Sequence, residues 1–277
     1  MASLLIAAAI AAASVAPAPA PALPTTQIPD ADPAIWVVND DDTVIFLFGT
    51  FHALDGKSAW FNDEVETAFA ASDELVLETI VPQRKRPAPA KPSATARRLP
   101  NLPLTPSASF LASTRMAISA GRARGMQADW GADTVLRRAA EQSGKPVRGL
   151  ESFLTQLGMF ARMPAQPMPS ATPRPGAPVE DPVAMENLAI VMGQMQSAWN
   201  RGDNYIFAMM LDQMRTNSPE TYSVMFTERN SNWAGWIAQR LQQPGTVFVA
   251  VGAGHLAGSD SVQAKLGELG IRSARIN

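Results

Sequence analysis

Two segments of the chain repeat the same order of residues, and this repeat limits the possible fold more than any other feature of the sequence. Residues 44–56 (VIFLFGTFHALDG) and 246–258 (TVFVAVGAGHLAG) both run from an apolar, β-branched stretch through Gly-x-x-His to a turn that contains glycine. The chain has only two histidines, His52 and His255, and each repeat carries one. The apolar runs predict buried strands, so each histidine is expected just beyond the end of a strand.

Two shorter apolar runs end on a carboxylate. ELVLE ends at Glu78 and KPVRGLE ends at Glu151, and both predict strands. The spacing of apolar residues predicts helices over 60–71 and 133–143, and the turn at 39–42 predicts a hairpin near the start of the sheet. Strands that alternate with helices are typical of a parallel sheet. We therefore expect an α/β fold, with a mixed sheet whose parallel core strands come from duplicated strand–helix units.

A mostly helical insertion is predicted between Glu151 and the second repeat. Its central helices, over 185–199 and 206–214, carry a stripe of methionines. Methionine clusters bind copper in some exported proteins, but core packing also requires apolar side chains at helical spacing, so we expect the stripe to be core. A helix over 259–269 and a strand over 271–276 are expected to close the chain.

Two proline-rich segments, 82–106 and 164–182, interrupt the periodic pattern, and each contains seven prolines. We interpret them as extended linkers or insertions outside the core. The first also carries six basic residues, which favour a solvated arm or, alternatively, a contact with an anionic envelope surface. Residues 23–277 are predicted to form a single domain that contains both segments.

Residues 1–22 have the apolar run and small-residue ending of a secretory signal peptide. We therefore expect an exported protein, periplasmic or extracellular. The chain has no cysteine, which excludes disulfides, zinc–thiolate sites and thiol nucleophiles. A formal net charge of −2 gives no reason to expect nucleic acid as a partner.

The carboxyl ends of parallel strands meet at one edge of a sheet, where ligands bind in open α/β folds. The sequence therefore predicts two imidazoles, from His52 and His255, and two carboxylates, from Glu78 and Glu151, at that edge. Imidazole and carboxylate together suit a divalent ion, with Mn²⁺ or Co²⁺ favoured and Zn²⁺ or Fe²⁺ as alternatives. Such an ion would activate water, with a spare glutamate as general base. The alternative is that these side chains are hydrogen-bonded structural residues.

Five motifs, LFGTFHALDG, ELVLE, GKPVRGLESFLTQ, RNSNWAGWI and VAVGAGHLAG, resemble in the same order those of the TraB/GumN family. This family is related to the Tiki proteins and more distantly to the erythromycin esterase and ChaN-like group. The resemblance covers about residues 33–277. It implies a metal site at His52, His255 and Glu78. Glu78, Glu151 and Arg229 are the implied catalytic residues.

The resemblance also implies a class of activity. Tiki proteins are described as divalent-metal-dependent proteases that act outside the cytoplasm, which favours an exported metallohydrolase, with a peptidase as its specific form. One alternative is a metal-free hydrolase of the erythromycin-esterase type, with a histidine base oriented by a glutamate. The other is a protein that binds a peptide or haem without catalysis. The substrate is a peptide or a small molecule that the sequence does not identify.

Overall fold

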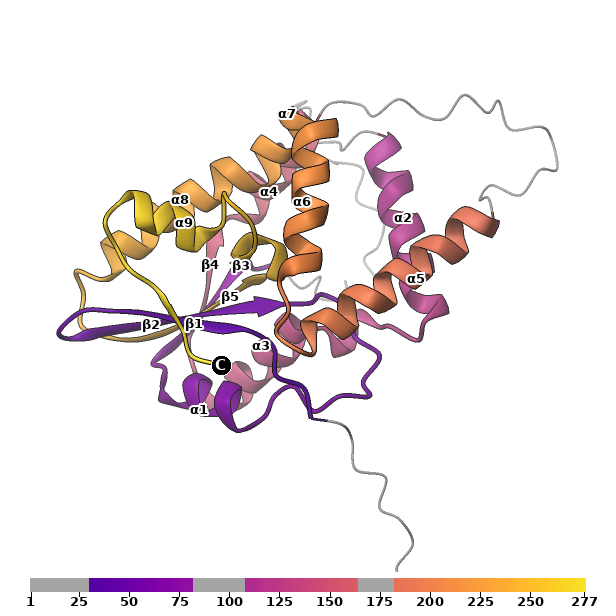
Figure 1. The fold of residues 1–277 in the computed structure, drawn as a ribbon. Helices are drawn as coiled ribbons and strands as arrows, with labels where there is room; N and C mark the ends of the chain where they lie inside the picture. Colours follow the sequence, from indigo (N-terminus) through magenta and orange to yellow (C-terminus); the bar gives the residue numbers. More distant parts are fainter. Residues whose placement is uncertain (1–29, 82–107, 164–181) are drawn as a thin grey trace, which may run out of the picture.

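The computed structural model describes residues 30–81, 108–163 and 182–277 (Figure 1). The predicted signal peptide, the segment 82–106 and all but the last residue of the segment 164–182 lie outside the described residues, so the predictions made for them stay predictions. Among the helices that the structure describes, none has the length and apolar character needed to cross a membrane.

A mixed sheet forms the centre of the molecule, as the sequence predicts. Its strand order is β4-β3-β5-β2-β1-β6, and the four strands β4, β3, β5 and β2 run parallel to one another. The hairpin of β1 and β2 is antiparallel, and β6 pairs antiparallel with β1. The strands are β1 (Ile35–Asn39), β2 (Thr43–Thr50), β3 (Glu74–Thr79), β4 (Val147–Glu151), β5 (Gly245–Gly252) and β6 (Ala274–Arg275).

Helices follow the order that the apolar spacing predicts. The strand expected over 271–276 is the element that differs most, because only two residues of it pair with β1. A π-helical turn, Ser223–Thr227, leads into α8. The α-helices are α1 (Asp63–Ala71), α2 (Ala108–Ala123), α3 (Ala132–Ser143), α4 (Phe153–Arg162), α5 (Pro182–Trp199), α6 (Tyr205–Asn217), α7 (Pro219–Tyr222), α8 (Glu228–Arg240) and α9 (Val262–Glu268).

The sheet is buried on both faces, which explains why its central strands are apolar without a break. Phe48 and Phe248 pack on one face, where α1 and α3 cover them. Val249 packs on the other face against Trp233 and Ile237 of α8 (Figure 1). Alternation along each strand therefore directs neighbouring side chains into two separate apolar layers.

Three helices, α2, α5 and α6, extend from the sheet beyond the carboxyl ends of its parallel strands (Figure 1). Trp199, at the end of α5, anchors this region by donating its indole N–H to the carbonyl oxygen of Gly49 at 2.7 Å. The methionine stripe is core only in part. Met192 and Met195 are half-buried against the core, whereas Met210 is 37% exposed.

Candidate functional site at the carboxyl edge of the sheet

The parallel register brings the predicted site residues to one edge. Thr50 at the end of β2 lies opposite Gly252 at the end of β5, and Thr79 of β3 lies opposite Glu151 of β4. His52 and His255 follow β2 and β5 by two and three residues. The prediction that two imidazoles and two carboxylates share an edge therefore agrees with the strand pairing.

Arg229 of α8 joins three of these groups. Its Nη2 donates to Glu78 Oε2 at 2.7 Å, and its Nε donates to Glu151 Oε1 at 2.8 Å. Its Nη1 lies 3.1 Å from His255 Nε2. The guanidinium is 8% exposed and packs on the ring of Trp233, 4.5 Å from the ring centroid. A buried cation with two largely buried carboxylates, 14% and 11% exposed, forms a compact charge cluster, which we call the Arg229 cluster (Arg229, Glu78 and Glu151).

His255 is held as a neutral imidazole. Its Nδ1 lies 2.6 Å from Asn230 Oδ1, an acceptor, so Nδ1 carries the proton and Nε2 accepts from Arg229. The ring is buried between Phe226 and Trp233, with centroid distances of 4.9 and 4.5 Å. Desolvation by burial, reinforced by the charge of Arg229, lowers the pKa of His255 to about 3 despite the attraction of Glu78. At neutral pH this histidine is a fixed acceptor.

Glu78 is ionised, and both of its oxygens are engaged. Oε1 accepts the backbone N–H of Gly252 at 2.6 Å, and Oε2 accepts from Arg229. Burial by itself raises the pKa of Glu78. The charge that His255 acquires below about pH 3, the charge of Arg229 and the Gly252 amide outweigh burial and lower the pKa of Glu78 to about 2. The carboxylate therefore keeps its charge throughout the physiological pH range.

His52 has the opposite surroundings. Its side chain is 66% exposed, and its Nδ1 pairs with Asp133 Oδ1 at 3.2 Å. Desolvation lowers its pKa, but the Asp133 hydrogen bond and the negative charge of Glu78 prevail and raise the pKa to about 9. Asp133 lies in the first turn of α3, which starts beside His52 because Ala132 N–H donates to Phe51 C=O at 3.0 Å. Only glycine fits at 131, where a Cβ would overlap the backbone carbonyl of His52.

Gly252 marks the point where these groups converge. A Cβ added there would lie 3.0 Å from Glu78 Oε1, 3.4 Å from His52 Nε2 and 3.7 Å from His255 Cδ2. The glycine of the second Gly-x-x-His motif thus leaves room for a carboxylate and two imidazoles to meet over one stretch of backbone.

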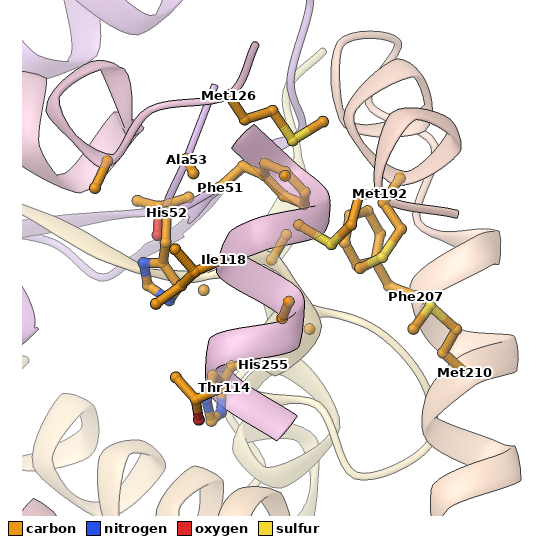
Figure 2. A pocket seen from close by; sticks show the side chains of 18 of the residues that line it. Phe51, His52, Ala53, Thr114, Ile118, Met126, Met192, Phe207, Met210 and His255 are labelled. Atoms are coloured by element: carbon orange, nitrogen blue, oxygen red, sulfur yellow. The ribbon is translucent and has the colours of Figure 1, made fainter. Parts of the chain in front are cut away.

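A pocket of about 790 Å³ opens above the two histidines. His52, Gly252 and His255 form part of its lining, and α2, α5 and α6 supply most of the rest (Figure 2). The members of the Arg229 cluster are not among the described residues that line the pocket, so they lie behind the histidines. The volume is within the range of small-molecule sites, about 300–1,000 Å³.

The predicted metal ligands do not form a metal-binding group in this arrangement. In the described ranges, 30–81, 108–163 and 182–277, no three His, Cys, Asp or Glu side chains are placed to hold an ion. The physical reason lies in the Arg229 cluster, because the guanidinium takes Glu78 Oε2 and faces the lone pair of His255 Nε2. Its positive charge lies where the charge of an ion would be needed. Metal binding at His52, His255 and Glu78 stays a prediction.

The structure also shows what the sequence patterns missed. Asp133, the partner of His52, was placed only in a helix, because 81 residues separate the two and no motif links them. Trp233 of α8 donates its indole N–H to Glu151 Oε1 at 3.1 Å, a contact that no sequence pattern indicates. Arg229, which the resemblance implies as a catalytic residue, is committed here to protein partners. For Asp133, the available signal was an acidic residue in the first turn of the predicted helix, two residues after Gly131.

The fold and this edge define a class: α/β proteins in which two strand-end Gly-x-x-His motifs surround a buried arginine–carboxylate cluster. The chain belongs to the TraB/PrgY/gumN family, whose sequence profile matches residues 34–109 and 93–275.

Among curated proteins, the chain is 30% identical over 139 residues to the uncharacterized protein YbaP of Escherichia coli strain K12 and to that of Shigella flexneri. The aligned region is 50% of this chain and 48% of each relative, so the chain spans about half the length of the curated relatives it matches. No solved structure matches the chain.

Proposed function

We propose that this protein is a hydrolase of ester or amide bonds in which His52, oriented by Asp133, transfers the proton. The observation that carries the proposal is the His52–Asp133 pair beside the pocket: Nδ1 contacts a carboxylate, and the ring is 66% exposed. A histidine whose far nitrogen is fixed by a carboxylate presents Nε2 in a defined orientation, as general acid–base catalysis requires.

In the proposed step, His52 acts in its neutral form, which becomes more populated as the pH rises toward its pKa of about 9. Nε2 of this form accepts a proton from a water molecule whose oxygen bonds to the substrate carbonyl carbon. The same proton then passes to the leaving oxygen or nitrogen as its bond to that carbon breaks, so one water is consumed and the imidazole is regenerated. Glu78 stabilises the transient imidazolium through its charge. Arg229 and Glu151 act as positioning residues, because they hold Glu78 and Trp233 behind the histidines.

A divalent-metal-dependent hydrolase, with a peptidase as its specific form, is the second candidate. One observation favours it. The position that a Cβ on residue 252 would occupy lies 3.4 Å from His52 Nε2 and 3.0 Å from Glu78 Oε1, so an imidazole and a carboxylate already converge there. This candidate requires Glu78 and His255 to leave Arg229. Mn²⁺ and Co²⁺ are the ions to test first, followed by Zn²⁺ and Fe²⁺.

The test uses the full chain after treatment with a chelator, with p-nitrophenyl butyrate and a p-nitroanilide amide as probes. The proposal expects turnover without added metal and a loss of about 100-fold or more in His52→Gln. Asp133→Asn should also reduce turnover. Asp212→Asn is the matched control, because Asp212 forms an ion pair with Arg215 on the surface of α6.

The alternatives give different outcomes. Turnover only with Mn²⁺ or Co²⁺ would replace the first candidate by the second. In that case an ion at 100 times its dissociation constant adds about 2.7 kcal/mol of stability, a melting shift of about 5–10 °C. The shift should disappear in His52→Ala and His255→Ala. Absence of turnover with and without metal would overturn both candidates in favour of a protein that binds a peptide or haem.

We further propose that the protein acts outside the cytoplasm, periplasmic or extracellular, on the basis of the apolar segment 1–22. The basic segment 82–106 is proposed to contact the anionic envelope surface. Fractionation of cells that express the tagged full chain tests the first point. Release from the envelope fraction by salt tests the second, because such contacts are screened at high ionic strength.

A further inference from the structure

The pocket above the histidines is apolar along most of its wall. Methionines from two helices contribute much of it, among them Met192 and Met195 of α5 and Met210 and Met214 of α6. Phe51 and Phe207 add aromatic surface (Figure 2). Methionine side chains are unbranched and flexible, so a wall built from them adapts to ligands of irregular shape.

Polar side chains are few among the described residues of the lining, and their positions are uneven. Three come from the strand ends, two from α2 and two from the segment between α2 and α3. In Figure 2, His52 and His255 lie toward one side of α2, and Met192, Phe207 and Met210 lie toward the other. The polar lining residues are Thr50, His52 and His255 at the strand ends, Thr114 and Arg122 on α2, and Gln127 and Asp129 between α2 and α3.

This distribution favours a ligand that is polar at one end only. A peptide laid along the pocket would bring an N–H and a C=O at every residue, and each needs a hydrogen-bond partner when it leaves water. The methionine wall supplies few partners. A hydrocarbon chain needs none, and each methylene that it buries contributes about 0.8 kcal/mol.

We propose that the pocket binds a single long acyl chain, with the carboxyl, ester or amide group of the ligand at His52 and the chain against the methionines of α5 and α6. The proposal rests on the proposed function, because the carbonyl carbon of the bound ligand would lie within reach of the water molecule that His52 Nε2 deprotonates. It names the substrate class as long-chain acyl esters or amides, whose hydrolysis releases a fatty acid and an alcohol or amine.

Binding is tested first, in the absence of detergent, by the melting temperature of the full chain with dodecanoate below its micelle concentration. Dodecanoate should raise the melting temperature in a saturable manner, and acetate at the same concentration should not. Turnover is then measured with p-nitrophenyl esters of butyrate, octanoate and dodecanoate. Because each buried methylene is worth about three- to fourfold, kcat/KM should rise at least tenfold from butyrate to octanoate.

Two adjacent methionines provide a matched pair of variants. Met210 lines the pocket, whereas Met209 is exposed and is not part of the lining. Met210→Gln keeps the length of the side chain but adds an amide to the apolar wall, so dodecanoate should bind at least fivefold more weakly. Met209→Gln should bind as the parent does. Ala117→Phe, which fills the pocket from α2, should also weaken binding and serves as the second variant.

The outcomes separate this proposal from the proposed function. Dodecanoate binding that Met210→Gln weakens, without turnover of any ester, supports the acyl pocket and overturns the hydrolase. Turnover that depends on His52 but shows no chain-length preference supports the hydrolase and overturns the acyl pocket. Dodecanoate binding that is equal in Met209→Gln, Met210→Gln and Ala117→Phe also overturns the acyl pocket.

Discussion

The two Gly-x-x-His motifs occupy equivalent positions at the ends of neighbouring parallel strands, yet their histidines have opposite properties. His255 is buried and neutral, with both ring nitrogens engaged by side chains of α8. His52 is exposed to the pocket and charged, with one nitrogen engaged by Asp133 of α3. The motif fixes where each imidazole lies, and the helix packed against it decides what the imidazole can do.

The difference arises from the two helices. Within one stretch of chain from the π-helical turn into α8, Phe226, Arg229, Asn230 and Trp233 all contact His255. At His52, the first turn of α3 provides a single acidic partner and leaves the rest of the ring open. We therefore interpret His255 as the structural member of the pair and His52 as the reactive one.

The largest expected effect comes from breaking the Arg229 cluster. Arg229→Met leaves Glu78 and Glu151 buried without their cation, and removal of one partner of a buried ion pair costs about 3–5 kcal/mol. Urea unfolding of the full chain measures the loss. Arg215→Met removes an exposed ion pair with Asp212 and should cost less than about 1 kcal/mol. Equal losses of unfolding free energy in Arg229→Met and Arg215→Met would contradict a buried charge cluster at Arg229.

Alanine at each histidine tests the comparison directly. His255→Ala removes a buried ring between Phe226 and Trp233 and leaves Asn230 and Arg229 with unmatched groups, so we expect a loss of about 2–4 kcal/mol. His52→Ala, at an exposed side chain, should cost less than about 1 kcal/mol. Urea denaturation compares the free energies of unfolding of the two variants. A larger loss in His52→Ala than in His255→Ala would make His52 the structural histidine and contradict our interpretation.

Proton titration gives the sharpest qualitative contrast, because the two imidazoles have the only histidine NMR signals of the chain. We expect one signal to titrate near pH 9, for His52, and the other to stay neutral down to about pH 3, for His255. Asp133→Asn should move the His52 midpoint down and leave His255 unchanged. Titration midpoints near pH 6.5 for both histidines would contradict both the charged state of His52 and the neutral state of His255.

These shifts also predict how stability depends on pH. The raised pKa of His52 means that its contribution to stability is complete below about pH 6.5 and is lost as the pH rises through about 9. The pKa of His255 is lowered, so the unfolded chain takes up its proton first and stability falls as the pH drops from 6.5 toward 3. His52→Gln should reduce only the loss of unfolding free energy at alkaline pH. His255→Gln should reduce only the loss at acid pH.

The sequence predicted the parts of this site that depend on local pattern. Apolar runs located the four parallel strands, and the residues at their ends located both histidines, Glu78 and Glu151. The charge partners depend on helix position, which no local pattern encodes: Asp133 reaches His52 only because Gly131 lets α3 start against the backbone of His52.

The methionine stripe shows a second limit of sequence patterns. Helical spacing shows that one face of a helix is apolar, but not whether that face meets protein or a cavity. Core was therefore the expectation for side chains such as Met192 and Met210, which in the structure line a pocket. The sequence could locate the helices of the insertion, whereas the space between them depends on how they pack.

The smallest difference between two variants is expected at the paired glycines of the two motifs, Gly49 and Gly252. A Cβ at Gly49 would meet Ala253 at 3.2 Å, whereas a Cβ at Gly252 would meet Glu78 Oε1 and His52 Nε2. Crowding of this kind costs about 1–3 kcal/mol, so both Gly→Ala variants should fold with similar losses. Only Gly252→Ala should shift the NMR midpoint of His52, because it displaces the carboxylate whose charge supports the imidazolium. A shift of equal size in Gly49→Ala would mean that general loosening of the strand ends, rather than the contact at Gly252, sets the properties of His52.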